Sequence, residues 1–138
     1  MGEEGYQDLV KNILETTRTI ADGVRAINGL QLLGNAEAMI VCFAGKGCNI
    51  YDVSDAMRRR GWTLNSLQNP AAVHLCVTGC HIGRAEEFLD DLRSCVEDVL
   101  KNPSSGGGQA AVYGATATLP AGPINELLCA YNDVVLRL

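Results

Sequence analysis

Apolar side chains recur every three or four residues along two long segments of the chain. The segments span residues 6–27 and 84–101, and this spacing places their apolar side chains on one face of a helix. A shorter helix is expected over residues 49–60, because Asn49 can cap a helix start and Gly61 can end the helix. The pattern therefore predicts three helices.

Three short apolar runs, residues 30–33, 39–44 and 72–78, have the length and composition of strands. A Gly-Asn pair at residues 34–35 suits a tight connection, so the first two strands are expected to be antiparallel neighbours. The order is helix, strand, strand, helix, strand, helix. This order predicts an α+β fold of two layers, with helices on one face of a small three-stranded antiparallel sheet.

The third predicted strand is apolar on both faces, which is typical of a strand covered on both sides. Successive side chains of a strand point to opposite faces. One face therefore carries Val73, Leu75 and Val77, and the other carries His74, Cys76 and Thr78. The short chain has helices for one face only, so the second face needs another domain or another subunit. For His74, a packing role and a role at that interface both remain open.

The composition changes after Pro103. Residues 104–108 are Ser-Ser-Gly-Gly-Gly, which is typical of a flexible linker, and Pro123 is well placed to open a final short helix. We therefore expect a folded domain over residues 1–103 and a linker with a C-terminal arm over residues 104–138. The tail after Gly106 is expected to be unordered when its partner is missing.

Charge and composition narrow the classes of function. The net charge of −5 argues against a nucleic-acid surface, which needs a basic stripe. No run of 18 apolar residues is present, so we expect no membrane contact by this segment. The N-terminus lacks the basic and apolar regions of a secretion signal, so the six cysteines are expected to be reduced thiols in a cytosolic compartment.

The residues predict no catalytic site and no metal site within this chain. The spacing of Cys76, Cys80 and His81 fits neither haem attachment nor a zinc finger, even with Cys48 as a fourth ligand. A Gly-Lys-Gly sequence at residues 45–47 lacks the Ser or Thr that follows Lys in a phosphate-binding loop, which favours a turn.

Tyr113 is the one large side chain in a Gly- and Ala-rich segment that follows the predicted linker. Its ring could anchor the arm by packing. Its hydroxyl could instead reach a phosphate or a cofactor. The residues alone leave both interpretations open.

Five blocks carry a resemblance to a known family. In chain order they are Gly-Glu-Glu-Gly-Tyr (2–6), Arg-Gly-Trp-Thr-Leu-Asn-Ser-Leu-Gln-Asn-Pro (60–70), Val-His-Leu-Cys-Val-Thr (73–78), Lys-Asn-Pro (101–103) and Val-Tyr-Gly-Ala (112–115). Together they resemble the sphingosine-1-phosphate lyases, which are fold-type-I pyridoxal-phosphate (PLP) enzymes. The similarity covers nearly the whole chain, and Leu-Asn-x-Leu-Gln and the late Tyr-Gly are its most specific parts.

The resemblance implies that this chain is the C-terminal domain of such a lyase. It implies a three-stranded antiparallel sheet that packs on a large PLP domain of the same polypeptide, and a homodimer with active sites between subunits. The family cleaves phosphorylated sphingoid bases by a retro-aldol reaction to phosphoethanolamine and a long-chain aldehyde, with the cofactor as electron sink. It further implies an enzyme of the endoplasmic reticulum membrane, with this domain on the cytosolic side and the anchor elsewhere.

The resemblance also assigns roles to single residues. It places Tyr113 at the active site, where its hydroxyl is expected to bind the substrate phosphate. The Schiff-base lysine of the family lies in a His-Lys motif that does not occur here, so the isolated chain is expected to be inactive. PLP would be held by the missing large domain.

Three other interpretations remain open at this point. The chain could be the C-terminal domain of an amino-acid decarboxylase of the same fold type. It could be a stand-alone ligand-binding or regulatory module, which would need a self-sufficient sheet and a pocket. It could also be a dimerisation module.

Overall fold

The computed structural model describes residues 2–102 together with positions 122, 126, 129, 130 and 133. Most of the predicted linker and arm, with Tyr113, lies outside the described residues. In the part of the chain that is described, no helix is long and apolar enough to cross a membrane.

Residues 2–102 form helices and strands in nearly the predicted order. The elements are α1 (Glu3–Ala26), β1 (Leu30–Leu33), β2 (Ile40–Gly45), α2 (Ile50–Arg59), β3 (Asn65–Leu67), β4 (Ala72–Cys76), the 3₁₀ turn η1 (Gly79–His81) and α3 (Ala85–Lys101). The three predicted helices are confirmed. Asn49 caps α2 as predicted, because its side-chain oxygen accepts a hydrogen bond from the Tyr51 amide at 3.0 Å.

The strands form one antiparallel sheet in the order β1-β2-β4-β3. The predicted antiparallel pairing of β1 with β2 is confirmed, although residues 34–39 connect them rather than a two-residue turn. The sheet has one strand more than predicted. The extra strand is β3, which pairs with β4 at the edge of the sheet.

The fourth strand depends on contacts with the rest of the fold. It has only three residues, and its burial does not alternate between apolar-in and polar-out positions. The Tyr51 hydroxyl on α2 donates a hydrogen bond of 2.7 Å to the Leu67 carbonyl oxygen, which ties the end of β3 to a helix. A periodicity argument on the sequence cannot detect a strand of this kind.

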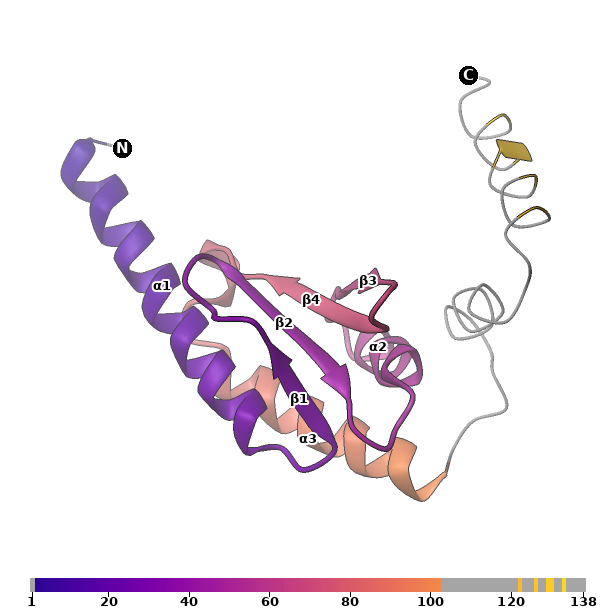
Figure 1. The fold of residues 1–138 in the computed structure, drawn as a ribbon. Helices are drawn as coiled ribbons and strands as arrows, with labels where there is room; N and C mark the ends of the chain where they lie inside the picture. The colour runs from indigo at the N-terminus through magenta and orange to yellow at the C-terminus, as the bar shows by residue number, and fades with distance from the viewer. Residues whose placement is uncertain (1, 103–121, 123–125, 127–128, 131–132, 134–138) are drawn as a thin grey trace.

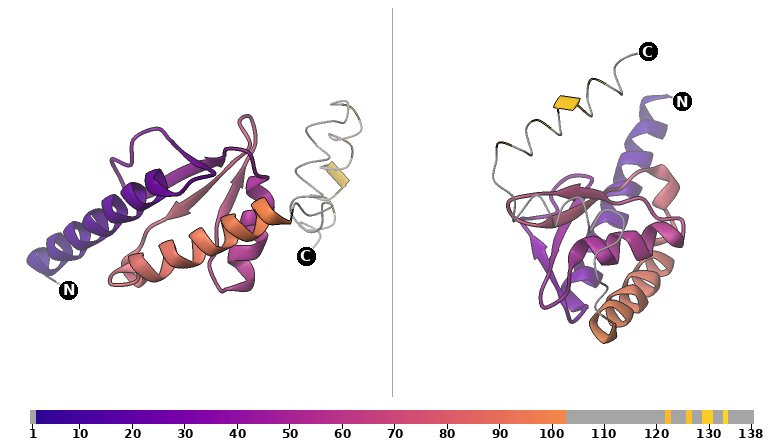
Figure 2. Two further views of the ribbon diagram at one scale, coloured as in Figure 1. Left: turned by 90° about the horizontal axis from the view of Figure 1, so that it is seen from below. Right: turned by 90° about the vertical axis from the view of Figure 1, so that its right-hand side faces the viewer.

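The helices cover one face of the sheet and leave the other face open. Figure 1 looks onto the open face, with α3 running behind β1, and Figure 2 shows the same two layers from two other directions. Helix α1 packs against β1, β2 and α3, while α2 packs against β4 and α3. The predicted α+β two-layer fold with helices on one face is therefore confirmed.

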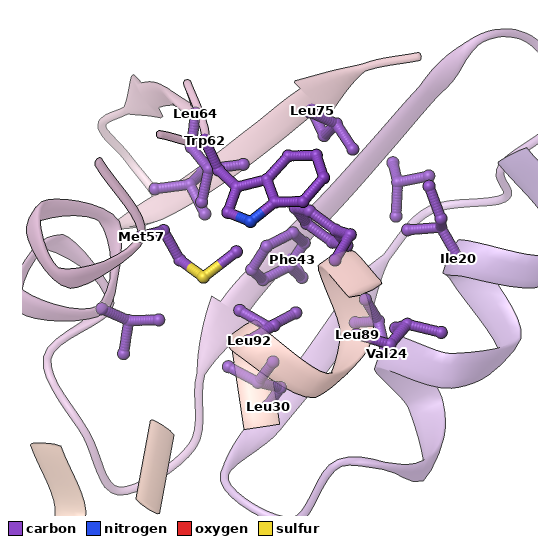
Figure 3. Packing of buried hydrophobic residues seen from close by; sticks show 14 of the residues in the cluster. Ile20, Val24, Leu30, Phe43, Met57, Trp62, Leu64, Leu75, Leu89 and Leu92 are labelled. Atoms are coloured by element: carbon purple, nitrogen blue, oxygen red, sulfur yellow. The ribbon is translucent and has the colours of Figure 1, made fainter. Parts of the chain in front are cut away.

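The core lies between the sheet and the three helices, and its side chains come from every layer (Figure 3). Phe43 and Val73 point into it from the two central strands and are fully buried. Its largest fully buried members are Phe43, Phe88, Ile20, Met57, Leu75, Leu92, Val24, Val41, Val53, Val73, Val77 and Val96. Burial of this apolar surface is the main favourable contribution to folding.

Trp62 links the segment after α2 to α3. Its ring makes an edge contact with Phe88, with ring centroids 5.2 Å apart at 88°. Its Nε1 donates a hydrogen bond of 2.7 Å to Asp91 Oδ2, and Arg60 Nη1 donates one of 2.9 Å to Asp91 Oδ1. The Trp62 hydrogen bond, followed by that of Arg60, lowers the pKa of the Asp91 carboxyl. We call Trp62, Arg60 and Asp91 the Trp62 brace.

Candidate interaction surface

The strand registers define which side chains share the open face of the sheet. Residues that lie directly opposite each other on neighbouring strands point to the same face. The pairs on the open face are Gln31 with Ala44, Leu33 with Cys42, Ile40 with Cys76, Cys42 with His74, Asn65 with His74, and Leu67 with Ala72. We call these residues the open sheet face.

The open sheet face carries no formal charge from carboxylates, lysines or arginines. None of its positions holds Asp, Glu, Lys or Arg, in a chain of which 20% of residues are charged. Ile40 is 50% exposed and Leu67 is 37% exposed, so large apolar side chains face solvent here. Partial burial raises the pKa of the Cys42 thiol, which keeps that thiol neutral at physiological pH. An apolar, uncharged patch of this kind is typical of a surface that another protein unit covers.

His74 lies in the middle of this face, as the alternation of the strand predicts. Its neighbours across the strands are Cys42 on β2 and Asn65 on β3, both uncharged. It is half-buried, and Cys76, two residues on, is exposed on the same face. The structure thus places His74 at the open face rather than in the core, which favours the interface role. Thr78 lies beyond the end of β4 and precedes η1 instead.

The Cys80 and His81 cluster has a structural explanation. The Thr78 amide donates a hydrogen bond of 3.0 Å to His81 Nδ1, which caps η1, and Cys80 Sγ lies 3.4 Å from the same nitrogen. The His81 ring also stacks on Trp62 at 6.3 Å. Among residues 2–102 and the other described positions, no group of three or more His, Cys, Asp or Glu could hold a metal ion.

The Gly-Lys-Gly sequence forms the predicted turn. The Lys46 amide donates a hydrogen bond of 2.8 Å to the Gly29 carbonyl oxygen, and Gly47 has a positive φ of 90° that an L side chain rarely adopts. All three lysines of the chain, Lys11, Lys46 and Lys101, are exposed. An exposed lysine is solvated by water, unlike the desolvated lysine that acts as a nucleophile in an active site.

A second exposed apolar region lies on α1 and was not identified from the sequence. No residue of α1 before Ile13 is buried, although Tyr6, Leu9 and Val10 belong to the predicted apolar stripe. Figure 1 shows these first turns extending past the edge of the sheet. Tyr6 is 63% exposed. The signal was present in the sequence, because the apolar stripe begins at Tyr6, whereas the buried positions of α1 begin at Ile13.

Comparisons with curated proteins relate this chain to one group of enzymes. No family model matches it. It is 41% identical over 135 residues to the sphingosine-1-phosphate lyase of Arabidopsis thaliana, covering 96% of this chain and 25% of that protein. It is 32% identical over 136 residues to sphingosine-1-phosphate lyase 1 of Rattus norvegicus, covering 96% of this chain and 24% of that protein. The chain is homologous to one domain of the sphingosine-1-phosphate lyases. It spans about a quarter of the length of the curated relatives it matches.

Solved structures agree with this relationship to the lyases. The sphingosine-1-phosphate lyase of Burkholderia pseudomallei superposes with a TM-score of 0.68 at 41% identity, covering 74% of this chain and 24% of that one. The glutamate decarboxylase of Lactobacillus brevis superposes with a TM-score of 0.64 at 19% identity, covering 72% of this chain and 26% of that one. The decarboxylase likeness shows the fold alone. The predicted resemblance to the lyase family is therefore confirmed.

Proposed function

We propose that this chain is the C-terminal small domain of a PLP-dependent sphingosine-1-phosphate lyase and that its open sheet face packs on the large PLP-binding domain. The observation that carries the proposal is homology to the lyases over 96% of the chain, combined with an open sheet face that has no Asp, Glu, Lys or Arg. A stand-alone domain would have little reason to keep that face free of charged residues, since water covers it.

The proposed enzyme cleaves a phosphorylated sphingoid base to phosphoethanolamine and a long-chain aldehyde. PLP, when bound to the large domain, supplies the electron sink for breaking the carbon–carbon bond. The part played by this chain is to cover the large domain, to exclude water from it and to hold its position. Exposure of the three lysines supports the view that the Schiff-base lysine lies on the large domain.

Further parts of the proposal concern the whole enzyme. We propose that Tyr113, on an arm over residues 104–138, donates a hydrogen bond from its hydroxyl to the substrate phosphate. We also propose a homodimer with active sites between subunits, located at the endoplasmic reticulum membrane with this domain on the cytosolic side. These parts rest on the resemblance to the family.

A domain exchange tests the central proposal. In the Burkholderia pseudomallei lyase, the matching segment is replaced by this chain, and PLP-dependent cleavage of a phosphorylated sphingoid base is measured. The control exchange inserts the corresponding segment of the Lactobacillus brevis decarboxylase, which has the same fold at low identity. We expect the first hybrid to cleave the substrate and the control hybrid to be inactive.

The activities of the two hybrids show whether the proposed function holds. A folded, PLP-loaded first hybrid that has no activity contradicts the proposed function. Equal activity in both hybrids means that any domain of this fold suffices, and the specific assignment to the lyases then fails.

A further inference from the structure

The start of α1 has only part of the usual stabilisation of a helix N-terminus, because Glu3 and Glu4 favour the positive end of the helix but no side chain caps it. Gly2 at the N-cap makes no side-chain cap hydrogen bond, and Gly5 lies inside the helix. A glycine there costs about 1 kcal/mol relative to alanine. No residue before Ile13 is fully buried, although Leu9 packs partly against the core. The first turns are therefore helical, but they have an apolar side that the rest of the described residues leaves exposed at Tyr6.

The exposed side of these turns continues the face that packs in the core. Tyr6 precedes Val24 by five full turns of about 3.6 residues, so both point in the same direction from the axis. Val24 is fully buried, whereas Tyr6 is 63% exposed. Val10 and Leu14 follow Tyr6 at the spacing of four residues that places side chains on one side of a helix. We call Tyr6, Val10 and Leu14 the α1 stripe.

The α1 stripe lies at the same end of the domain as one end of the open sheet face. Helix α1 packs against η1, where Leu9 faces Gly79, and η1 follows closely on the end of β4 at Cys76. Cys76 is paired across the sheet with Ile40, whose side chain is 50% exposed. Figure 1 shows the end of β4 directed toward the N-terminal half of α1.

We infer that the α1 stripe and the Ile40–Cys76 end of the open sheet face form one docking site for the large domain of the same enzyme. The inference rests on the proposed function. Two observations favour the large domain as the occupant. The stripe lies at the same end of the domain as the Ile40–Cys76 pair of the open sheet face, and the relatives contain about three times as much chain again as this segment matches. Docking covers the apolar side of the first turns of α1.

The test uses the active hybrid described under Proposed function, so that a failure of that proposal is seen first. Val10→Glu places a carboxylate within the α1 stripe. Asn12→Glu is the matched control, because Asn12 is exposed and lies on the opposite side of the helix. Lyase activity is measured together with hydrogen exchange of the amides of residues 3–14, and both variants are also made in the chain alone.

We expect Val10→Glu to reduce the activity of the hybrid by about tenfold or more, since burying an unpaired carboxylate is costly. Asn12→Glu should stay within about twofold of the parent, as surface substitutions usually do. The amides of residues 3–14 should exchange slowly in the hybrid and fast in the chain alone, and Val10→Glu should abolish the difference. Neither variant should change the stability of the chain alone.

Two results overturn the inference. One is an active hybrid in which Val10→Glu and Asn12→Glu behave alike and residues 3–14 exchange as fast as in the chain alone. The other is a chain that forms a dimer by itself, with slow exchange of residues 3–14, and that becomes monomeric with Val10→Glu. That result assigns the α1 stripe to a second copy instead of the large domain.

Discussion

Replacement of Asp91 by alanine tests whether the Trp62 brace holds α3 against the segment after α2. The substitution removes the acceptor of two hydrogen bonds, one from Trp62 Nε1 at 2.7 Å and one from Arg60 Nη1 at 2.9 Å. Trp62 is 5% exposed, so its N–H has little access to water once the carboxylate is gone. The variant should therefore unfold more easily.

The two hydrogen bonds to Asp91 contribute unequally to the stability of the fold. A donor left without a partner in a largely buried position costs about 1–3 kcal/mol. The Arg60 side chain is 35% exposed and that of Asp91 29%, so their ion pair is screened by water and contributes at most about 1 kcal/mol. We expect Asp91→Ala to lower the free energy of unfolding by about 1–3 kcal/mol, with most of the loss coming from Trp62.

The stabilisation that the hydrogen bonds to Asp91 provide depends on pH. Hydrogen bonds from Trp62 and Arg60 lower the pKa of Asp91 in the folded chain, so the unfolded chain binds a proton more readily. The stabilisation is therefore complete above the carboxyl's unfolded pKa of about 4 and is lost as the pH falls through the lower folded value. The difference in stability between the parent and Asp91→Ala should shrink as the pH falls below about 4.

Trp62 is the single tryptophan of the chain, so its fluorescence reports the unfolding directly. Urea unfolding of the parent, Asp91→Ala, Trp62→Phe and the double variant gives a double-mutant cycle, with circular dichroism used where tryptophan is absent. Coupling of about 1 kcal/mol or more between the two sites supports the brace. Additive effects at pH 7, or a stability difference that does not change with pH, would refute it.

Three further substitutions test other contacts. Gly23→Ala should destabilise the chain by about 1–2 kcal/mol, because a Cβ there would overlap the Leu89 side chain. The loss should be smaller in a Leu89→Ala background, and urea unfolding measures both values. Tyr51→Phe should cost about 1 kcal/mol and speed amide exchange in β3, whereas Tyr6→Phe in the same assay should change neither. In the active hybrid, Tyr113→Phe should raise the KM for the phosphorylated substrate by about tenfold; an unchanged KM contradicts the proposed phosphate contact.

The fold was predictable where a local pattern and the final packing agree. The stripes of α1 and α3 have the helical period over enough residues to exclude a strand, and Asn49 supplies a cap of recognised type. Strand β3 could not be predicted in this way. Its pairing depends on β4 and on the Tyr51 hydroxyl, and neither contact is encoded within the three residues themselves.

The open sheet face was predictable in kind but not in the arrangement of its residues. Alternation along residues 72–78 indicated a face in need of a partner, and the structure shows that this face holds His74 and Cys76. The four strands contain no Asp, Glu, Lys or Arg at any position, so the absence of charge can be read from the sequence. Only the register shows that Leu33, Cys42, His74 and Asn65, from segments far apart in the chain, form one row. The Trp62 brace is invisible for the same reason, because Trp62 and Asp91 are 29 residues apart.

The open sheet face and the α1 stripe together favour a single covering neighbour more strongly than either surface does alone. A sheet face without charge needs a cover, and so does the apolar side of the first turns of α1, where the rest of residues 2–102 leaves Tyr6 exposed. The two requirements meet at the end of the domain where β4 leads into η1. A single neighbour that satisfies both would cover the α1 stripe and bury Ile40 in one event, so docking should be cooperative. Val10→Glu in the hybrid should then raise hydrogen exchange in β2 as well as in α1. Exchange that rises in α1 alone would mean that the two surfaces have separate partners.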